Sequence, residues 1–223
     1  MSKELENLRK KIDKIDFEFL KKFVISEKMQ RIELKNKIPK VFDLKLIGSR
    51  IILRPLKFSD IPNIYSNIQG LKIAEHKLWV SYPFKPKDAR EYIKKARKSL
   101  RARKSFVFGI ELKSKKEIIG CFSLYDADLK LEHEIGYWLG EKYHGQGLMS
   151  EAAMMVLDFA FKKLKFHRVW ADVFSDNIAS QKLLKKLGFK KEGYHRKSFW
   201  HWGRWRDSVH FGLLAEEFLN KSK

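Results

Sequence analysis

The sequence predicts an α/β (α+β) domain, in which helices flank a mixed central sheet, preceded by a helical extension. From residue 46 onward, strand patterns alternate with helical patterns, which is typical of this class. A glycine turn joins a strand to an apolar helix at residues 143–154. Residues 3–38 show helical periodicity alone. We therefore expect an extension over residues 1–45 and one α/β domain over residues 46–223.

The extension reads as one amphipathic helix that ends at Pro39. Its apolar residues recur at spacings of three and four: Leu5, Leu8, Ile12, Ile15, Phe19 and Phe23. The segment LRKKIDKIDFEFLKKF resembles the first helix of the AroQ-type chorismate mutases. The later helices of that family are not visible here, so we predict no mutase activity. A helix of this length either breaks near residues 24–26 or packs on a second copy, which would make the protein a homodimer.

The first half of the α/β domain contains a strand, two helices and three further strands. RIILRPL (50–56) is a strand, and SDIPNIYSNI is a helix that we expect Ser59 to cap, with Asp60 in its first turn. Residues 85–104 form a strongly basic helix. The consecutive strands are SFVFGIEL, EIIGCFSLYD and LEHEIGYWL. The polar turn KSKK suits a hairpin between the first two of these.

The second half continues the alternation. A helix of about 15 residues follows the glycine turn, with one buried apolar stripe. FHRVWADVF is a strand, and DNIASQKLLKKLGF is a helix with Asn177 near its start and Gly188 as its C-terminal cap. The tail should form two strands joined around Gly203, then a short helix.

The composition restricts the class of partner. The 223 residues include 48 Lys and Arg against 27 Asp and Glu, a net charge of +21. Such an excess attracts nucleic acid, anionic membranes or phosphorylated small molecules, and disfavours a polycationic substrate. Cys121 is the single cysteine, which excludes an intrachain disulfide and a cysteine-based metal site. We expect a cytoplasmic protein without a membrane partner, because the N-terminus has no apolar signal core and the longest apolar stretch is interrupted by Asp158.

The glycine turn YHGQGLMSEAAM has the features of an anion site. The first amides of a helix have no partner inside the helix, they carry the positive end of its dipole, and glycine lets a bulky anion approach them. The turn is not a P-loop, because GK[ST] is missing, and it is not the dinucleotide fingerprint, because the third glycine is missing. A phosphate ligand is therefore expected, without a metal.

This turn is similar to the acetyl-CoA motif R/Q-x-x-G-x-G/A of the GNAT N-acetyltransferases. Here the window reads HGQGLM, with His144 where Arg or Gln is usual and Met149 where Gly or Ala is usual. The segments HEIGYWL, VWADVF, DNIAS and EGYHRK surround it in the order of that family. The resemblance covers about residues 48–218 and is strongest to the ribosomal-protein alanine N-acetyltransferases of the RimJ/RimL branch. It implies a GNAT acyl-CoA N-acyltransferase fold and acetyl-CoA as cosubstrate.

The resemblance also implies a set of cofactor-binding residues. The strand that ends at Trp138 and Leu139 would pair its backbone with the pantetheine arm, beside a splay between this strand and VWADVF. Asn177 and Ser180 would lie near the thioester. Leu184 stands where many relatives have a tyrosine that protonates the thiolate, so Ser180, water or unassisted departure would replace it. The pyrophosphate would be held by the amides of Gln146, Gly147, Leu148, Met149 and Ser150.

Glu134 is our candidate for the catalytic base. An α-amine titrates near 8, so a carboxylate acting through water is sufficient. With strand alternation, Glu134, Gly136 and Trp138 share one face, and His133, Ile135 and Tyr137 share the other. A strand amide near Trp138 or Leu139 would polarise the thioester carbonyl. The alternative for Glu134 is an exposed carboxylate that pairs with a lysine and has no catalytic role. The base would then be another residue, for which His201 and His210 are the candidates.

The resemblance implies acetyl transfer to a primary amine by direct attack in a ternary complex, and its branch suggests a protein N-terminus such as that of a ribosomal protein. The alternatives are acetylation of a small amine such as an amino sugar, and a non-catalytic scaffold that binds CoA or RNA. The tail SFWHWGRWRD mixes three tryptophans with basic residues. It fits base stacking with phosphate contacts, a hairpin with one packed face, or a wall of the substrate channel. The basic helix at 85–104 is either a solvated face or a contact with ribosomal RNA.

Overall fold

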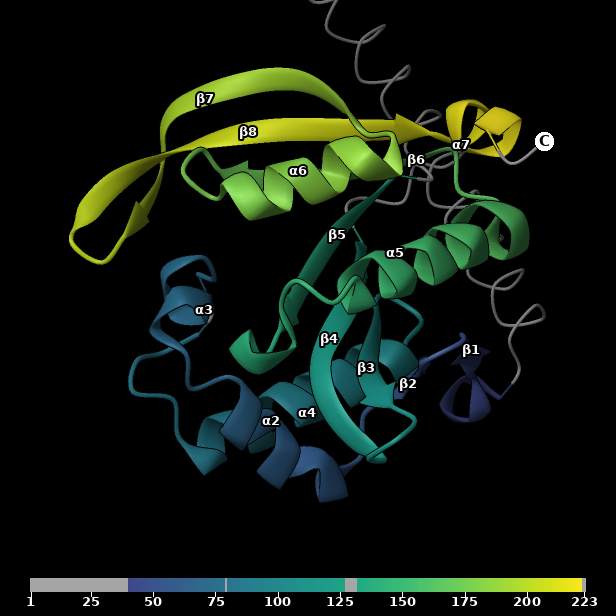
Figure 1. Cartoon of the computed structure of the whole chain (residues 1–223), viewed down its shortest axis with the longest axis vertical. Coiled ribbons are helices and arrows are strands. Elements are labelled where there is room, and N and C mark those ends of the chain that lie inside the picture. Colours follow the sequence, from purple (N-terminus) through teal and green to yellow (C-terminus); the bar gives the residue numbers. More distant parts are fainter. Residues whose placement is uncertain (1–39, 79, 127–131, 222–223) are drawn as a thin grey trace, which may run out of the picture. The chain divides into compact units, whose positions relative to one another are not determined.

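The computed structural model describes residues 40–78, 80–126 and 132–221 (Figure 1). Eight strands form one mixed sheet in the order β1-β2-β3-β4-β5-β6-β8-β7. Neighbouring strands are antiparallel except for β5 and β6, which are parallel. The bounds of the strands are β1 Leu46–Ile47, β2 Ile51–Pro55, β3 Phe106–Leu112, β4 Glu117–Asp126, β5 Glu132–Leu139, β6 Arg168–Phe174, β7 Lys190–His201 and β8 Arg204–Leu214. The predicted mixed sheet flanked by helices is confirmed.

Helices connect these strands at the predicted positions, and a short helix that was not predicted, α3, follows α2. The bounds of the α-helices are α2 Ile61–Asn67, α3 Leu71–Glu75, α4 Pro86–Arg101, α5 Leu148–Asp158, α6 Ile178–Leu187 and α7 Ala215–Lys221. Short 3₁₀ turns lie at Val41–Asp43, Phe58–Asp60 and Glu141–Tyr143. The helix expected at 3–38, with its mutase-like segment and its role in dimerisation, lies outside the described residues. Within the described ranges, no helix is both long and apolar enough to cross a bilayer.

The core has two layers, one on each face of the sheet. On one face, buried residues of α2 and α4 pack with Val107, Ile118, Cys121 and Trp138. On the other face, Phe159, the residue directly after α5, makes edge contacts with the rings of Phe106 and Phe108. Because side chains alternate along β3, Val107 and its two neighbours enter opposite layers. The sheet is therefore covered on both faces around its centre.

Two local details differ from the sequence-based expectation. Ser59 does not cap α2, because the chain enters the helix through a 3₁₀ turn and the N-cap is Asp60. The helix after the glycine turn also changes its winding: α5 ends at Asp158, and Phe159–Leu164 continue as a π-helical segment. The predicted apolar stripe is confirmed, since Ala153, Val156, Leu157, Ala160, Phe161 and Leu164 are all buried.

Asp60 serves a buried ion pair instead. Both Asp60 and Arg54 are buried, with exposed fractions of 4% and 8%. Arg54 donates from Nη1 and Nη2 to the Asp60 carboxylate at 2.9 and 2.8 Å, and from Nε to Glu111 at 2.5 Å. Asp60 also accepts from the backbone N–H of Lys57 at 2.7 Å. This network ties β2 and β3 to the start of α2.

We expect Asp60→Ala to lower the free energy of unfolding by about 3–5 kcal/mol, because it leaves the buried Arg54 guanidinium without its main partner. Urea unfolding should show a lower midpoint with an unchanged slope. The matched control is Asp158→Ala, which removes an exposed carboxylate 2.7 Å from Lys162 one helical turn away. That change should cost less than about 0.5 kcal/mol. Equal losses in the two variants would contradict the assignment.

Candidate active site

The strands β5 and β6 separate partway along their length. In the described chain, they pair at Glu132–Arg168, His133–Val169 and Glu134–Trp170 and not beyond, although β5 continues to Leu139. A cavity of about 460 Å³ lies where pairing ends. Residues from both faces of β5 line it, including Glu134 and Tyr137, together with Asp172 of β6 and Ser180 of α6. The predicted splay between β5 and β6 is present, and the cavity that it leaves is lined by residues from both faces of the sheet.

Glu134 lies on the wall of this cavity and is half-buried. Burial raises the pKa of Glu134 above its usual value, and the nearby Asp172 carboxylate raises it further, while Lys77 and His210 oppose the rise. Lys77 comes from the loop after α3, and burial lowers its pKa to about 8. No lysine lies within ion-pair distance of Glu134 among the described residues, so the paired surface carboxylate is the weaker interpretation.

Asp172 faces the same cavity from β6 and is held by a histidine. Nδ1 of His210 on β8 donates to Asp172 Oδ1 at 2.9 Å, and Arg168 Nη2 donates to the other ring nitrogen at 3.2 Å. Arg168 in turn forms two hydrogen bonds with Glu192, at 2.8 and 2.6 Å. His210 therefore acts on the cavity through Asp172, and its ring nitrogens are both engaged.

The opposite face of β5 presents a hydroxyl pair. The Tyr137 and Ser180 hydroxyls lie 2.5 Å apart, and both residues line the cavity. Burial raises the pKa of Tyr137 to about 12, with the Ser180 hydrogen bond acting against it. Leu184, at the position of the tyrosine in many relatives, is fully buried. A tyrosine thus reaches Ser180 from the strand and not from the helix, which the sequence analysis missed because the two residues are 43 positions apart.

Asn177 joins the same wall of the cavity as the N-cap of α6. Its Oδ1 accepts the Ser180 backbone N–H at 3.1 Å. Gly188 ends the helix with φ of +99°, as predicted. The cap fixes the first turn of α6, and with it the position of the Ser180 hydroxyl beside Tyr137.

The backbone of β5 presents polar groups to the opening. Gly140 N–H bonds the Ile119 carbonyl at 2.8 Å, so in this antiparallel pair even-numbered residues direct their amides toward β4. Tyr137 and Leu139 then direct theirs toward the side on which β6 has departed. Trp138, with an exposed fraction of 4%, packs its side chain in the core. Of the two amides considered for the thioester carbonyl, that of Leu139 has the suitable direction.

The glycine turn connects the end of β5 to α5. Gly145 and Gly147 both have φ of +74°, which disfavours other residues. Gly147 is the N-cap of α5 and supplies no side-chain acceptor, and its carbonyl receives the first helical bond from Glu151 N–H at 3.1 Å. The amides of Leu148, Met149 and Ser150 precede that bond and have no acceptor inside the helix. The turn therefore offers several N–H donors to an anion.

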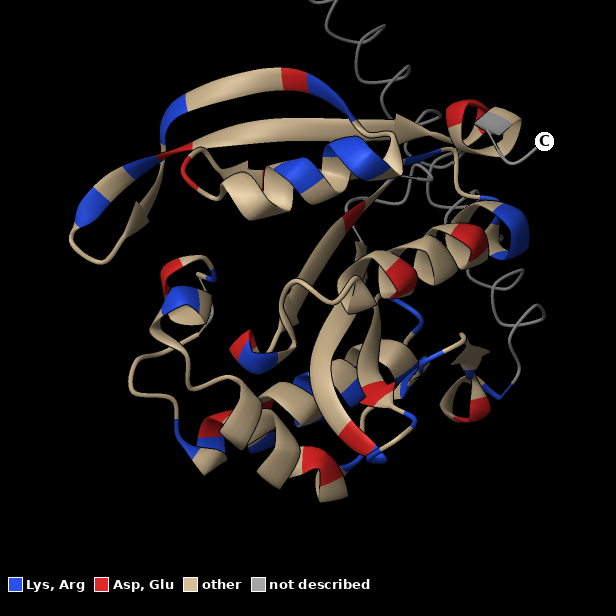
Figure 2. Cartoon of the chain, in the orientation of Figure 1, with Lys and Arg blue, Asp and Glu red and all other residues tan. Residues whose placement is uncertain are grey.

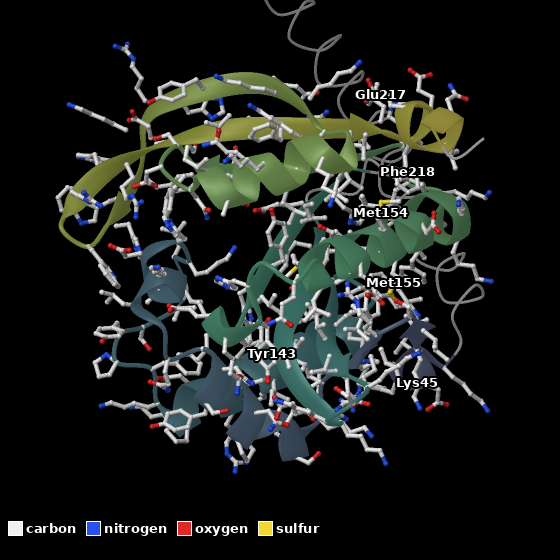
Figure 3. All side chains as sticks on the ribbon, viewed as in Figure 1. Lys45, Tyr143, Met154, Met155, Glu217 and Phe218 are labelled. Atoms are coloured by element: carbon white, nitrogen blue, oxygen red, sulfur yellow. The ribbon has the colours of Figure 1, made fainter. Side chains whose placement is uncertain are left out.

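Three contacts brace this turn. His144 Nε2 donates to the Leu139 carbonyl at 2.8 Å, which ties the turn to the strand end and gives His144 a structural position. Buried Tyr143, labelled in Figure 3, comes just before it. The Tyr143 hydroxyl donates to Glu117. Arg50 Nη1, from the residue just before β2, donates to the Gln146 carbonyl at 2.7 Å. Sequence analysis missed Arg50, which lies 96 residues from Gln146.

Arg50 also binds the first turn of α5. Its Nε and backbone N–H each donate to the Glu151 carboxylate at 2.9 Å, and Ser49 Oγ donates at 3.1 Å. Burial alone would raise the pKa of Glu151, but these hydrogen bonds lower it overall. The half-exposed guanidinium is therefore paired with the Glu151 carboxylate, and it fixes the first turn of α5 beside the open amides.

The other histidines have structural positions. His201 is buried and donates from Nε2 to the Ala74 carbonyl at 3.0 Å, so it fastens β7 to α3. His133 stacks on Phe166 with ring centroids 3.6 Å apart, and burial lowers its pKa to about 4. Neither suits a base that must reach the amine. Among the described residues, no group of three or more His, Cys, Asp or Glu side chains is placed to hold a metal ion.

Comparison with known proteins agrees with this geometry. Residues 50–190 match the family described as "Acetyltransferase (GNAT) domain". The "Probable N-acetyltransferase YjcK" of Bacillus subtilis is 33% identical over 179 residues, which are 76% of this chain and 96% of that protein. The ribosomal protein uS5-alanine N-acetyltransferase of Escherichia coli is 36% identical over 116 residues, 51% of this chain and 60% of the relative.

A solved structure shows the same architecture. The ribosomal-protein-S5-alanine acetyltransferase of Vibrio fischeri superposes with a TM-score of 0.71 at 25% identity, over 79% of this chain and 99% of that one. The family match spans the glycine turn, both diverging strands and α6. The chain is an acetyltransferase and belongs to the GNAT family, as the sequence motifs predicted.

Proposed function

We propose that the enzyme transfers the acetyl group of acetyl-CoA to the α-amine of a protein N-terminus, by direct attack in a ternary complex. The observation that carries this proposal is the opening between β5 and β6. There the Glu134 carboxylate and the Tyr137–Ser180 pair line one cavity from opposite faces of β5. Amide formation from a thioester needs a base for the amine and a proton for the thiolate, and the opening supplies both.

Acetyl-CoA suits the donor side of this opening. The open amides at the start of α5 favour the pyrophosphate, and Arg50 holds the turn in place through the Gln146 carbonyl and Glu151. We propose that the amides of Gln146, Gly147, Leu148, Met149 and Ser150 hold it. The polar backbone of β5 at Tyr137 and Leu139 would then pair with the pantetheine arm, and Asn177 and Ser180 would flank the thioester.

The reaction then proceeds with these groups. Glu134 accepts a proton from the acceptor amine, directly or through water, and the nitrogen attacks the thioester carbon. The carbonyl oxygen becomes negative, and the Leu139 N–H stabilises it. When the C–S bond breaks, the thiolate takes a proton from the Ser180 hydroxyl, and Ser180 takes one from Tyr137. Solvent then returns to Tyr137 the proton that Glu134 accepted.

The chemistry favours an α-amine over a lysine side chain as acceptor. An α-amine titrates near 8, whereas a lysine amine titrates near 10.4, so far less of the lysine is neutral at physiological pH. Two relatives are named as ribosomal-protein alanine acetyltransferases, which supports an N-terminal amine. A ribosomal protein would be a cytoplasmic substrate, and the net charge of +21 would favour encounter with the ribosome.

Free-thiol release from acetyl-CoA tests this proposal. We expect release with lysine-free peptides that begin with alanine or serine, and none with the same peptides acetylated at the N-terminus. Tandem mass spectrometry should locate the acetyl group on the α-nitrogen. If only an amino sugar caused thiol release, the acceptor would be a small amine and not a protein N-terminus. If the protein bound CoA tightly but no amine caused release, it would be a non-catalytic CoA-binding scaffold.

A further inference from the structure

Three of the six tryptophans of the chain lie within the outer part of the β7–β8 hairpin, residues 196–206, which we call the hairpin tip. Trp200, Trp202 and Trp205 have exposed fractions of 57%, 46% and 56%. Large aromatic side chains in this state, gathered on one element, mark interaction surfaces. The tip extends beyond α6, on the side of the domain where α3 lies (Figure 1). A hairpin with one packed face, one of the interpretations of this segment, would therefore not explain why these three rings are exposed.

The rings stand on a fixed scaffold. Trp200 and Trp205 are cross-strand partners with centroids 5.4 Å apart at 70°. The turn between the strands has positive φ at Trp202 and Gly203, the geometry of a tight hairpin. On the other face, His201 donates to the Ala74 carbonyl at 3.0 Å and Arg206 to the Glu75 carbonyl at 2.7 Å. The hairpin thus presents its rings without a large loss of conformational entropy on binding.

The charges at the tip have one sign. Arg196, Lys197 and Arg204 are exposed, and no described carboxylate lies within ion-pair distance of their side chains. Asp207 is the single acidic residue between positions 194 and 214. It is already engaged by the Tyr194 hydroxyl and, at 2.7 Å, by the Lys197 backbone N–H. Figure 2 shows Lys and Arg on both strands near the turn.

We propose that the hairpin tip binds single-stranded RNA, with bases stacked on Trp200 and Trp205 and phosphates on Arg196 and Lys197. Aromatic faces beside exposed cations are the chemistry that single strands require. A cationic peptide would be repelled by the same charges. A membrane-inserting tip would place its charges behind the outermost turn, whereas Arg204 directly follows Gly203. This function is separate from acetyl transfer and does not depend on it.

Fluorescence anisotropy with a labelled mixed-sequence RNA strand tests the proposal on the full chain, without acetyl-CoA or acceptor. We expect the double variant Trp200→Ala/Trp205→Ala to weaken binding by about tenfold or more with an unchanged salt dependence. Arg196→Gln/Lys197→Gln should reduce the slope of log K against log salt by about 0.7 for each phosphate that the variant no longer neutralises. Circular dichroism confirms folding of each variant.

The controls separate this site from general attraction to a basic protein. Lys94→Gln/Lys98→Gln removes the same charge from the exposed face of α4, and Tyr65→Ala removes a partly exposed ring from α2. Both should bind RNA as the wild type does. Equal weakening by the α4 variant, or full RNA binding by the tryptophan variant, would overturn the proposal. If the tryptophan variant lost only binding to phosphatidylserine vesicles, or only raised KM for peptides, the occupant would be a membrane or the acceptor.

Discussion

Glu134→Gln is expected to reduce kcat/KM for the acceptor by about 10²- to 10⁴-fold, the usual contribution of a positioned general base. The amide has nearly the same shape as the carboxylate but cannot accept the proton of the amine. CoA binding should be unchanged, because Glu134 lies on the opposite face of β5 from the Tyr137–Ser180 pair. Steady-state kinetics and calorimetric titration with CoA measure the two quantities separately.

Glu91→Gln is the matched control for this prediction. Glu91 lies on the exposed face of α4, where its carboxylate is 3.7 Å from Lys94. The same change of carboxylate to amide should leave kcat/KM at the wild-type value there. If Glu134→Gln retains wild-type activity, the base is another group, and His210 with Asp172 becomes the next candidate.

The pH profile gives an independent test of Glu134. The base must be ionised, so kcat/KM should rise with pH through the pKa of Glu134, which burial and Asp172 hold above its usual value. Asp172→Asn removes one negative neighbour, so the pKa of Glu134 falls and the acidic limb moves to lower pH. Glu134→Gln should abolish the limb. An unchanged limb in both variants would assign it to another group, such as Lys77.

The second large effect is expected at the glycine turn. Gly147→Val should raise the dissociation constant for CoA by about tenfold or more, because hydrogen bonds to charged groups contribute about 1.5–3 kcal/mol each. Gly147 has φ of +74°, and a β-branched residue there is strained by about 1–3 kcal/mol. The turn relieves this strain by shifting, which moves the amides of Leu148 and Met149 away from the pyrophosphate.

Gly203→Val provides a control with the same backbone strain in another place. Gly203 has φ of +72°, and a Cβ atom there would meet nothing within 4 Å. Both variants should lose similar stability in urea, but CoA affinity should fall in Gly147→Val alone. Equal affinities of the two variants for CoA would mean that the start of α5 does not hold the pyrophosphate.

Local sequence was sufficient for much of this molecule. The order of strands and helices, the glycine turn, the Asn177 and Gly188 caps and the hairpin turn at Gly203 depend on periodicity and on the backbone preferences of a few residues, which act over short distances. The same alternation put Glu134 and Tyr137 on opposite faces of β5. Ser59 was a wrong cap because a 3₁₀ turn leads into α2 and moves the N-cap position to Asp60.

The site itself was decided by the tertiary structure. Where β5 and β6 stop pairing, which hydroxyl meets Ser180, and which charge braces the glycine turn depend on residues 36 to 101 positions apart, for which no local pattern exists. The raised pKa of Glu134 likewise needs burial and the Asp172 carboxylate on another strand. Sequence periodicity determines which face a side chain occupies, but only packing determines which residues share that face and how much water remains around them.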